Sequence, residues 1–386
     1  QSFAALHGNI NGTGTLAATT LFLISDQNIV FSTPGMPLVT NLALLADADG
    51  NGTGKLTLLN PVAVSGNLRI AANDIDGGAG GTRLTAQNLL LQSGQSEQVQ
   101  IELRGPSTTQ PGLLDARSAA DLQITADSSV ELKDLDGSGR ALESSLATGD
   151  IALNAAGSIK VTSKLYTGGN ITLTSAADVV VNAAVDPQTV TISAANDLVI
   201  SSQITADRLI SLTAGTDGTG SLLTTAVSRL EAGGSTAIGD IALAAGSSAG
   251  DIQTHGVVRA ADRLSATALA GTINGTAELT ARAVSLKAGL GIGNTAPLRV
   301  RADNVAADTA NGNIQLTSER DTVYTSITTG TGEIQIDSTG SADFTGARSQ
   351  SGTIRLNVSN GRLNVGKAVA AEGSLLFRTT GSGNIT

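Results

Sequence analysis

The sequence contains no cysteine and no tryptophan, and aromatic residues make up only 2 % of its 386 residues. Without cysteine the chain has no disulfide bond and no thiolate metal site, so its stability must come from packing and hydrogen bonding. The scarcity of large rings favours a thin interior filled by Ile, Leu, Val and Ala. Proline is also scarce, with 7 residues, so most backbone N–H groups are available for β-sheet ladders.

The charge balance and the hydropathy restrict the partners. The formal net charge is −10 at pH 7, which argues against nucleic acid and against an anionic membrane surface, because both require basic residues. No run of about 18 apolar residues occurs, so we predict no membrane span. The sequence begins at Gln1 without Met and shows no signal peptide. We therefore expect that a leader was removed or that the sequence is a piece of a longer chain.

What the sequence does contain is a short apolar phrase with a fixed period. Ile151, Ile171, Val190 and Ile210 open successive copies, which are 20, 19 and 20 residues apart. A second alternating run and a third apolar position, the latter beginning with Leu165, repeat with the same spacing. We predict that Ile151, Ile171 and Val190 stack in one inward-facing column, and that Ile314, Ile334 and Ile354 form another part of the same column.

A period of about 20 residues indicates one supersecondary unit per repeat, which must stack on its neighbours to bury its apolar face. Apolar residues alternate within each copy, so Ile151 and Leu153 face one side of a strand and Ala152 faces the other. Small and polar stretches such as Ala176-Ala177-Asp178 separate the runs and are typical of turns. The sequence predicts an all-β protein, a parallel β-solenoid with two or three short strands and about 20 residues per turn.

We expect one continuous solenoid over residues 1–386, with some less regular regions. Residues 1–60 carry apolar runs at uneven spacing. Loop excursions from the coil are predicted near 104–118 and 214–240, where turn-forming residues gather. Residues 256–310 are less periodic, and we favour strands over a short helix there.

The phrase returns at Ile314, Ile334 and Ile354, again 20 residues apart, and opens once more at Gly383-Asn384-Ile385-Thr386, where the sequence stops. Solenoids usually end in polar or atypical caps, and open strand edges invite pairing with another chain. We therefore expect an internal segment of a longer chain, which continues covalently or stacks end to end with other copies.

The Gly-[Asp/Asn]-Ile-x-Leu phrase, with Ala-Ala-Gly and Ala-Ala-Asp between strands, resembles the repeat region of filamentous-haemagglutinin-type exoproteins, which are very large secreted β-helix adhesins of bacteria. The resemblance covers most of the chain and is strongest at 149–214 and 312–358. It implies a right-handed parallel β-helix that is exported, often by a two-partner route, and displayed at the cell surface. The Asn-Pro-Asn-Gly motif of that family's secretion domain is missing, since Val62 follows Asn60-Pro61, so the export route stays open.

A catalytic function finds little support in the residues. The two histidines, His7 and His255, each stand alone among small residues, so a Ser-His-Asp triad is not indicated. The alternative function is a polysaccharide-active β-helix enzyme, a lyase or a hydrolase, which needs Asp, Arg and Lys clustered on one outer face. The expected outward positions carry residues such as Ala152, Thr172 and Gln315 instead, and only 2 Tyr and no Trp are available to pack against sugar rings.

We therefore predict that the chain is not an enzyme. It is interpreted as a structural and interaction segment of an extracellular bacterial β-solenoid rod, an adhesin or a surface fibre, which is secreted or held at the cell surface. The expected partners are other copies or further repeats of the same chain, and a host or neighbouring-cell surface.

One loop suggests a metal. Asp47-Ala48-Asp49-Gly50-Asn51-Gly52 matches the first six positions of an EF-hand-type calcium loop, although Leu58 stands where the bidentate Glu is expected. Looser relatives occur at Asp74-Ile75-Asp76-Gly77 and at Asp134-Leu135-Asp136-Gly137. The spacing predicts weak calcium binding by Asp47, Asp49 and Asn51, at about 10⁻⁴–10⁻³ M. The alternative is turn chemistry, in which these side chains accept hydrogen bonds from local backbone N–H groups. No other cofactor is predicted.

Overall fold

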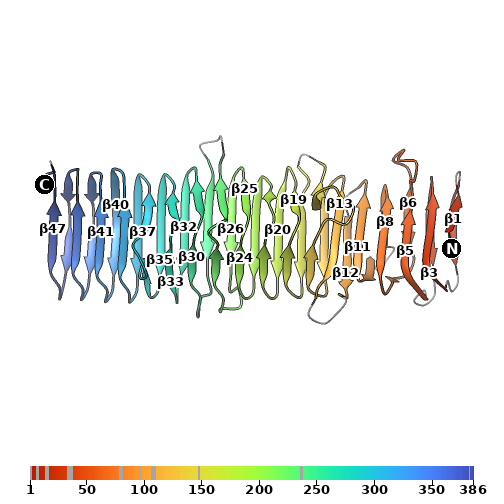
Figure 1. Ribbon diagram of the computed structural model, residues 1–386, viewed down its shortest axis with the longest axis horizontal. Coiled ribbons are helices and arrows are strands. Elements are labelled where there is room, and N and C mark those ends of the chain that lie inside the picture. Colours follow the sequence, from red (N-terminus) through yellow and green to blue (C-terminus); the bar gives the residue numbers. More distant parts are fainter. Residues whose placement is uncertain are drawn as a thin grey trace. The chain divides into compact units, whose positions relative to one another are not determined.

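The computed structural model describes residues 2–5, 8–13, 17–32, 38–77, 81–95, 97–105, 110–146, 148–234, 238–381 and 383–386. These residues form strands and turns without a helix, so none of them forms a helix long and apolar enough to cross a membrane. The chain divides into two compact units, residues 1–188 (unit 1) and 189–386 (unit 2). Each unit is a parallel β-solenoid with about 21 residues per turn, which confirms the predicted fold class (Figure 1). The continuation of one coil from unit 1 into unit 2 stays a prediction.

The described strands of unit 1 form three parallel sheets. Sheet A contains β1 (Ser2–Ala5), β3 (Ala17–Ser25), β5 (Leu38–Leu45), β8 (Asn67–Ala72), β11 (Asn88–Ser93), β13 (Gly112–Ser118), β15 (Val130–Leu132), β16 (Arg140–Ser144), β18 (Ile159–Val161), β19 (Lys164–Tyr166), β21 (Val179–Val181) and β22 (Val185–Asp186). Sheet B contains β2 (Ile10–Thr13), β4 (Ile29–Ser32), β6 (Lys55–Leu58) and β9 (Asp74–Asp76). Sheet C contains β7 (Val62–Ala63), β10 (Thr82–Ala86), β12 (Glu97–Leu103), β14 (Leu122–Ala126), β17 (Ile151–Ala155) and β20 (Asn170–Ser175).

The described strands of unit 2 form two parallel sheets. Sheet D contains β24 (Leu198–Ile200), β25 (Gln203–Ala206), β27 (Leu222–Thr224), β28 (Arg229–Ala232), β30 (Ile252–Thr254), β31 (Val257–Ala260), β33 (Thr272–Gly275), β34 (Glu278–Thr280), β36 (Gly291–Ile292), β37 (Leu298–Arg301), β39 (Ile314–Ser318), β41 (Ile334–Ser338), β44 (Ile354–Val358) and β47 (Leu375–Thr379). Sheet E contains β23 (Thr189–Ala194), β26 (Leu209–Thr213), β29 (Asp240–Ala244), β32 (Arg263–Ala268), β35 (Ala283–Ala288), β38 (Asn304–Thr309), β40 (Thr322–Thr329), β42 (Ala342–Phe344), β43 (Ala347–Ser349), β45 (Leu363–Val365) and β46 (Ala368–Ala370).

The predicted inward columns are present in each unit. In unit 1, Ile151 lies opposite Ile171 in the neighbouring strands β17 and β20, and both side chains are buried. In unit 2, Val190 is buried and lies opposite Ile210. The pairs Ile314–Ile334 and Ile334–Ile354 also lie opposite each other, and all three side chains are buried. They belong to sheet D, whereas Val190 belongs to sheet E, so the prediction that they share its column is wrong. The same apolar phrase forms a strand in either sheet, because the alternation fixes the inward face and not the sheet. Alternation along the strands therefore sets which side chains fill the interior.

The Gly of the repeated phrase lies where successive turns approach closely. A Cβ atom on Gly332 would lie 2.1 Å from the carbonyl oxygen of Gly312, which leaves room for hydrogen only. The next residue of the phrase links one turn to the next. Oδ1 of Asp150 accepts hydrogen bonds from the backbone N–H and the side-chain amide of Asn170, both at 2.9 Å. The phrase is thus a corner that fixes the register between turns.

The loop excursions are shorter than the sequence predicted. Within 104–118, β13 buries Leu114 and Ala116, and within 214–240, β27 and β28 bury Leu222 and Leu230. β27 and β28 are only 3 and 4 residues long, and β13 begins directly after Pro111 with Gly112 as its first residue, so the alternation of these strands is hard to see in the sequence. Residues 256–310 form strands, as expected. His7 lies outside the described residues.

Candidate functional site

The predicted calcium ligands Asp47, Asp49 and Asn51 lie in an exposed loop between β5 and β6. The backbone is left-handed at Asp47 (φ 63°), at Gly50 (φ 69°) and at Gly52 (φ 78°). The two carboxylate oxygens of Asp47 accept hydrogen bonds from the Gly52 N–H at 3.1 and 3.0 Å, and Asp49 accepts one from the Asn51 amide at 2.7 Å. The oxygens that calcium would need are therefore bonded inside the loop, as the turn interpretation requires.

The relative at Asp134 folds in the same way, in the loop between β15 and β16. Gly137 and Gly139 stand at the same offsets as the two glycines of the Asp47 loop and also have positive φ, at 87° and 84°. Oδ1 of Asp134 accepts from the Gly137 N–H and Oδ2 from the Gly139 N–H, each at 2.7 Å. The Asp-x-Asp-Gly-x-Gly pattern thus folds into a loop closed on its first carboxylate, because glycine adopts both left-handed positions without strain.

The third relative does not form such a loop. Asp74 and Asp76 belong to strand β9, and Lys55 of the neighbouring strand β6 pairs with both carboxylates, at 3.2 and 3.0 Å. These groups are more than 40 % exposed, so the pairs contribute little to stability.

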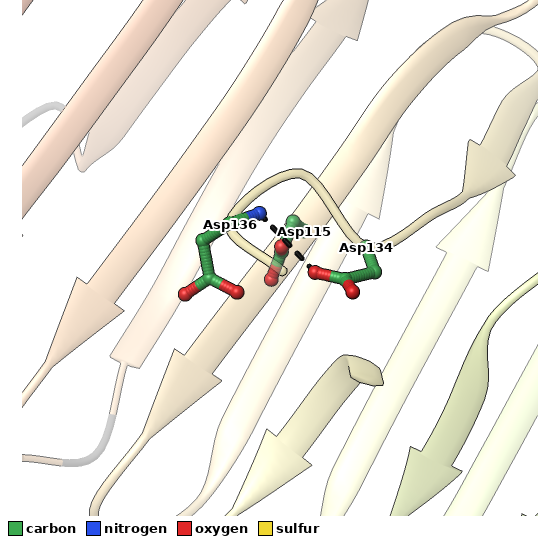
Figure 2. A group of neighbouring side chains, drawn as sticks. All are labelled: Asp115, Asp134 and Asp136. Atoms are coloured by element: carbon green, nitrogen blue, oxygen red, sulfur yellow. Dashed lines mark hydrogen bonds between the residues drawn. The ribbon is translucent and has the colours of Figure 1, made fainter. Parts of the chain in front are cut away.

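The Asp134 loop brings three carboxylates together on the outer face of sheet A (Figure 2). Oxygens of Asp115, Asp134 and Asp136 all lie within 4.8 Å of one another. Asp115 occupies an outward position of β13, yet its side chain is 0 % exposed because the loop covers it. The backbone N–H of Leu135, at the centre of the loop, donates to Oδ2 of Asp115 at 2.7 Å.

Arg117, two residues beyond Asp115 on β13, supplies the cation of this cluster. Its Nη2 donates to Oδ1 of Asp136 at 2.6 Å and lies 3.7 Å from Oδ1 of Asp115. Its Nε lies 3.8 Å from Glu143 of β16. Asp136 also accepts a hydrogen bond from the Gln92 side chain of β11 at 3.2 Å. The network therefore joins three strands of sheet A to the loop.

The pKa values of Asp115 and Asp136 shift in opposite directions. Burial raises the pKa of Asp115 to about 6, although the hydrogen bond from Leu135 and the charge of Arg117 oppose this shift. Burial also acts against the ionisation of Asp136, but hydrogen bonds from Arg117 and Ser138 outweigh it and lower its pKa to about 2.

The donor set does not fit a calcium ion. Calcium takes six to eight oxygen ligands, roughly 2.3–2.6 Å away. Both oxygens of Asp134 and both oxygens of Asp136 already accept hydrogen bonds, and only Oδ1 of Asp115 lacks a hydrogen-bond donor. Arg117 holds the positive charge that a cation would supply. The cluster is therefore an internal ion-pair network that ties the loop to sheet A.

Unit 2 carries a groove of about 530 Å³ at the end of sheet D. The outward residues Thr317, Asp337, Asn357 and Arg378 line it from four successive strands, and Glu319 adds a second carboxylate. Asp337 accepts a hydrogen bond from Asn357 at 2.7 Å. Two carboxylates and one arginine in a groove are the arrangement that the polysaccharide-active alternative requires.

The aromatic residues of unit 2 do not serve that groove as a sugar platform. Tyr324 and Phe344, two of the three aromatic residues of unit 2, stack in the interior, with ring centroids 4.5 Å apart, and are 0 % and 2 % exposed. The third, Phe377 of β47, is not among the residues that line the groove. His255 lies in a turn after β30, where its Nδ1 is 2.9 Å from the Thr276 hydroxyl. Among the described residues, no carboxylate pairs with the His255 ring, so no nucleophile–histidine–carboxylate arrangement forms around it.

Sequence reasoning missed Asp115, Arg117 and a second buried acid, Glu97. Glu97 faces the interior at the start of β12 and is 5 % exposed. It accepts hydrogen bonds from the Ser93 hydroxyl at 2.5 Å and from the Ile75 N–H at 3.3 Å. Burial raises the pKa of Glu97 to about 7. The one sequence signal for Glu97 was its charge at a position where the alternating run calls for an apolar residue.

The strands, the inward columns and the repeated corners define a class, the parallel β-solenoid repeat proteins. No family model, no curated protein and no solved structure matches this chain.

Proposed function

We propose that this chain is a structural and interaction segment of an extracellular bacterial β-solenoid rod of the filamentous-haemagglutinin type, an adhesin or a surface fibre. The observation that carries the proposal is the outer surface of the turns. One outward column of sheet E consists of small residues on successive strands, namely Thr191, Ser211, Ala242, Ser265, Ser285, Ala306 and Ser326. Such a surface presents hydroxyl and methyl groups for contact and few groups for acid–base chemistry.

The last turn of unit 2 supports assembly with further turns. Leu375 continues the inward column of Ile334 and Ile354, but it is 47 % exposed, whereas Ile354 is 0 % exposed. Among the described residues, β47 pairs with β44 alone. An apolar strand edge with free N–H and C=O groups invites another strand. A turn of the same kind in a second copy of the chain is the proposed partner.

The proposal is tested by detecting the protein on the surface of intact cells. An antibody against the chain, applied to intact cells that produce the natural protein, should bind, and protease added outside the cells should remove the signal. A cytoplasmic protein of the same cells is the control and should stay protected from the protease. Antibody binding only after the cells are broken would contradict the extracellular proposal.

The polysaccharide-active alternative is favoured by one observation, the Glu319, Asp337 and Arg378 groove. It is tested by incubating the chain with acidic polysaccharides and measuring new reducing ends and unsaturated products. We expect none. Product formation that is lost in Asp337→Asn, but kept in a variant of an exposed carboxylate elsewhere such as Asp217→Asn, would replace the structural proposal with an enzyme.

A further inference from the structure

A second groove, of about 380 Å³, lies on the outer face of sheet A in unit 1. The strand register places Phe22, Ala43, Arg69 and Leu90 opposite one another on β3, β5, β8 and β11. Ala43 is the small member of this column, and the missing side-chain volume leaves a hollow beside Phe22. Leu135, from the Asp134 loop, lines the groove at the Leu90 side.

The groove has an apolar surface and one amide wall. Phe22 is 40 % exposed there, more than any other aromatic ring whose side chain the structure describes. The neighbouring outward column forms an amide ladder, in which Asn67 donates to Asn41 at 3.0 Å and Asn88 donates to Asn67 at 2.7 Å. Each amide has two N–H hydrogens, and the ladder uses one of them while it occupies the oxygens of Asn41 and Asn67. The amides of this wall therefore keep N–H groups that can donate hydrogen bonds to a ligand.

Arg69 supplies the charge of the groove. Among the described residues, no carboxylate forms an ion pair with its guanidinium, and Leu90 separates it from Asp115 in the column. An unpaired guanidinium next to apolar surface is suited to a carboxylate, which it can bind through two parallel hydrogen bonds. Donors, one cation and an apolar hollow together complement an anion with an apolar body.

We propose that this groove binds a linear amphipathic carboxylate. The carboxylate lies on Arg69 and the Asn67 amide, and the apolar chain runs over Ala43 to Phe22. Neighbouring strands are about 4.8 Å apart, so Arg69 and Phe22 are roughly 10 Å apart along the column, the length of a chain of about eight carbons. The groove volume is at the small-molecule end of ligand pockets, which favours this ligand over a macromolecule. The proposal is independent of the surface function proposed above.

The test is calorimetric titration of the whole chain with octanoate, 1-octanol and octyltrimethylammonium, which share a chain length and differ in the head group. We expect saturable octanoate binding with one site, about tenfold weaker binding of octanol and no binding of the cation. Equal binding of all three probes would show apolar adsorption alone and would overturn the proposal. So would the absence of octanoate binding into the millimolar range.

Two variants locate the site. Ala43→Leu fills the hollow and should abolish octanoate binding, whereas Ala152→Leu, at an outward position of sheet C, should leave it unchanged. Arg69→Met should reduce octanoate affinity to that of octanol and leave octanol binding unchanged. Unfolding curves confirm that each variant is folded.

Octanoate binding that survives both Ala43→Leu and Arg69→Met places the ligand elsewhere and overturns the proposal. A second copy of the chain is the competing occupant of the groove. Dimers in sedimentation that Ala43→Leu disperses, without octanoate binding to the wild type, would assign the groove to that copy instead.

Discussion

At the scale of single residues, two carboxyl groups of unit 1 are held in surroundings that oppose their charge. The pKa of Glu97 rises from 4.5 to about 7, and that of Asp115 from 3.8 to about 6, in both cases through burial. The folded pKa lies above the unfolded value, so the native state binds more protons between the two values. The free energy of unfolding contributed by each group is therefore fully present at low pH and falls as the pH rises through this window.

Asp115→Asn tests this linkage, because the amide oxygen can still accept the Leu135 N–H. The variant cannot ionise, so its stability relative to wild type should grow by on the order of 2 kcal/mol between about pH 4 and about pH 8. Urea unfolding at both pH values measures the difference. A difference that shrinks with rising pH would mean that the pairing of Asp115 with Arg117 outweighs its burial.

Arg117 is expected to matter more than an arginine in an exposed pair. Arg117→Gln leaves Asp115, Asp136 and Glu143 without their shared cation, and we expect a loss of about 3 kcal/mol. Arg83→Gln is the matched control, since Arg83 pairs with Asp127 at 3.3 Å and both groups are about half exposed. That control should lose less than about 1 kcal/mol. Equal losses in chemical denaturation would show that the Arg117 network is no stronger than a surface pair.

A further prediction concerns calcium binding by the Asp47 loop. Because Asp47 and Asp49 already accept hydrogen bonds within the loop, we expect the same thermal unfolding midpoint in millimolar calcium and in EGTA. A midpoint that rises with calcium in the wild type, and no longer rises in Asp49→Ala, would restore the calcium interpretation for Asp47, Asp49 and Asn51.

At the scale of the structural element, the corner between turns decides which strands pair in register. Gly332 stacks on Gly312, and a Cβ at Gly332 would lie 2.1 Å from the Gly312 carbonyl oxygen. Gly332→Ala must therefore push two turns apart, and we expect a loss of about 2 kcal/mol. Gly346→Ala is the control, because its Cβ would lie 4.0 Å from the nearest neighbouring atom, the carbonyl oxygen of Thr325. Thermal unfolding of both variants measures the difference, and equal effects would contradict this account of the corner.

At the scale of the whole molecule, the exposed edge of the last turn predicts self-association. Leu375 and Leu376 of β47 are 47 % and 51 % exposed, and burying them against another turn would remove this apolar surface from water. Sedimentation should show association that grows with concentration. Leu375→Lys should reduce it, whereas Leu59→Lys, at a position 56 % exposed in unit 1, should not. A monodisperse monomer of the natural full-length protein would count against end-to-end stacking.

The sequence by itself determined the fold class, the turn length and which residues face inward. These depend on alternation within a strand and on a fixed period, as at Ile151 and Ile171, and both can be read without knowing what lies across the interior. The tertiary structure decided the rest. The step from Leu42 to its partner Leu68 is longer than the common period because a loop intervenes, and such steps cannot be read from a repeat. Asp115 became a buried acid only because a loop from the next turn folds over it, so its surroundings depend on three-dimensional register and not on neighbours in the sequence.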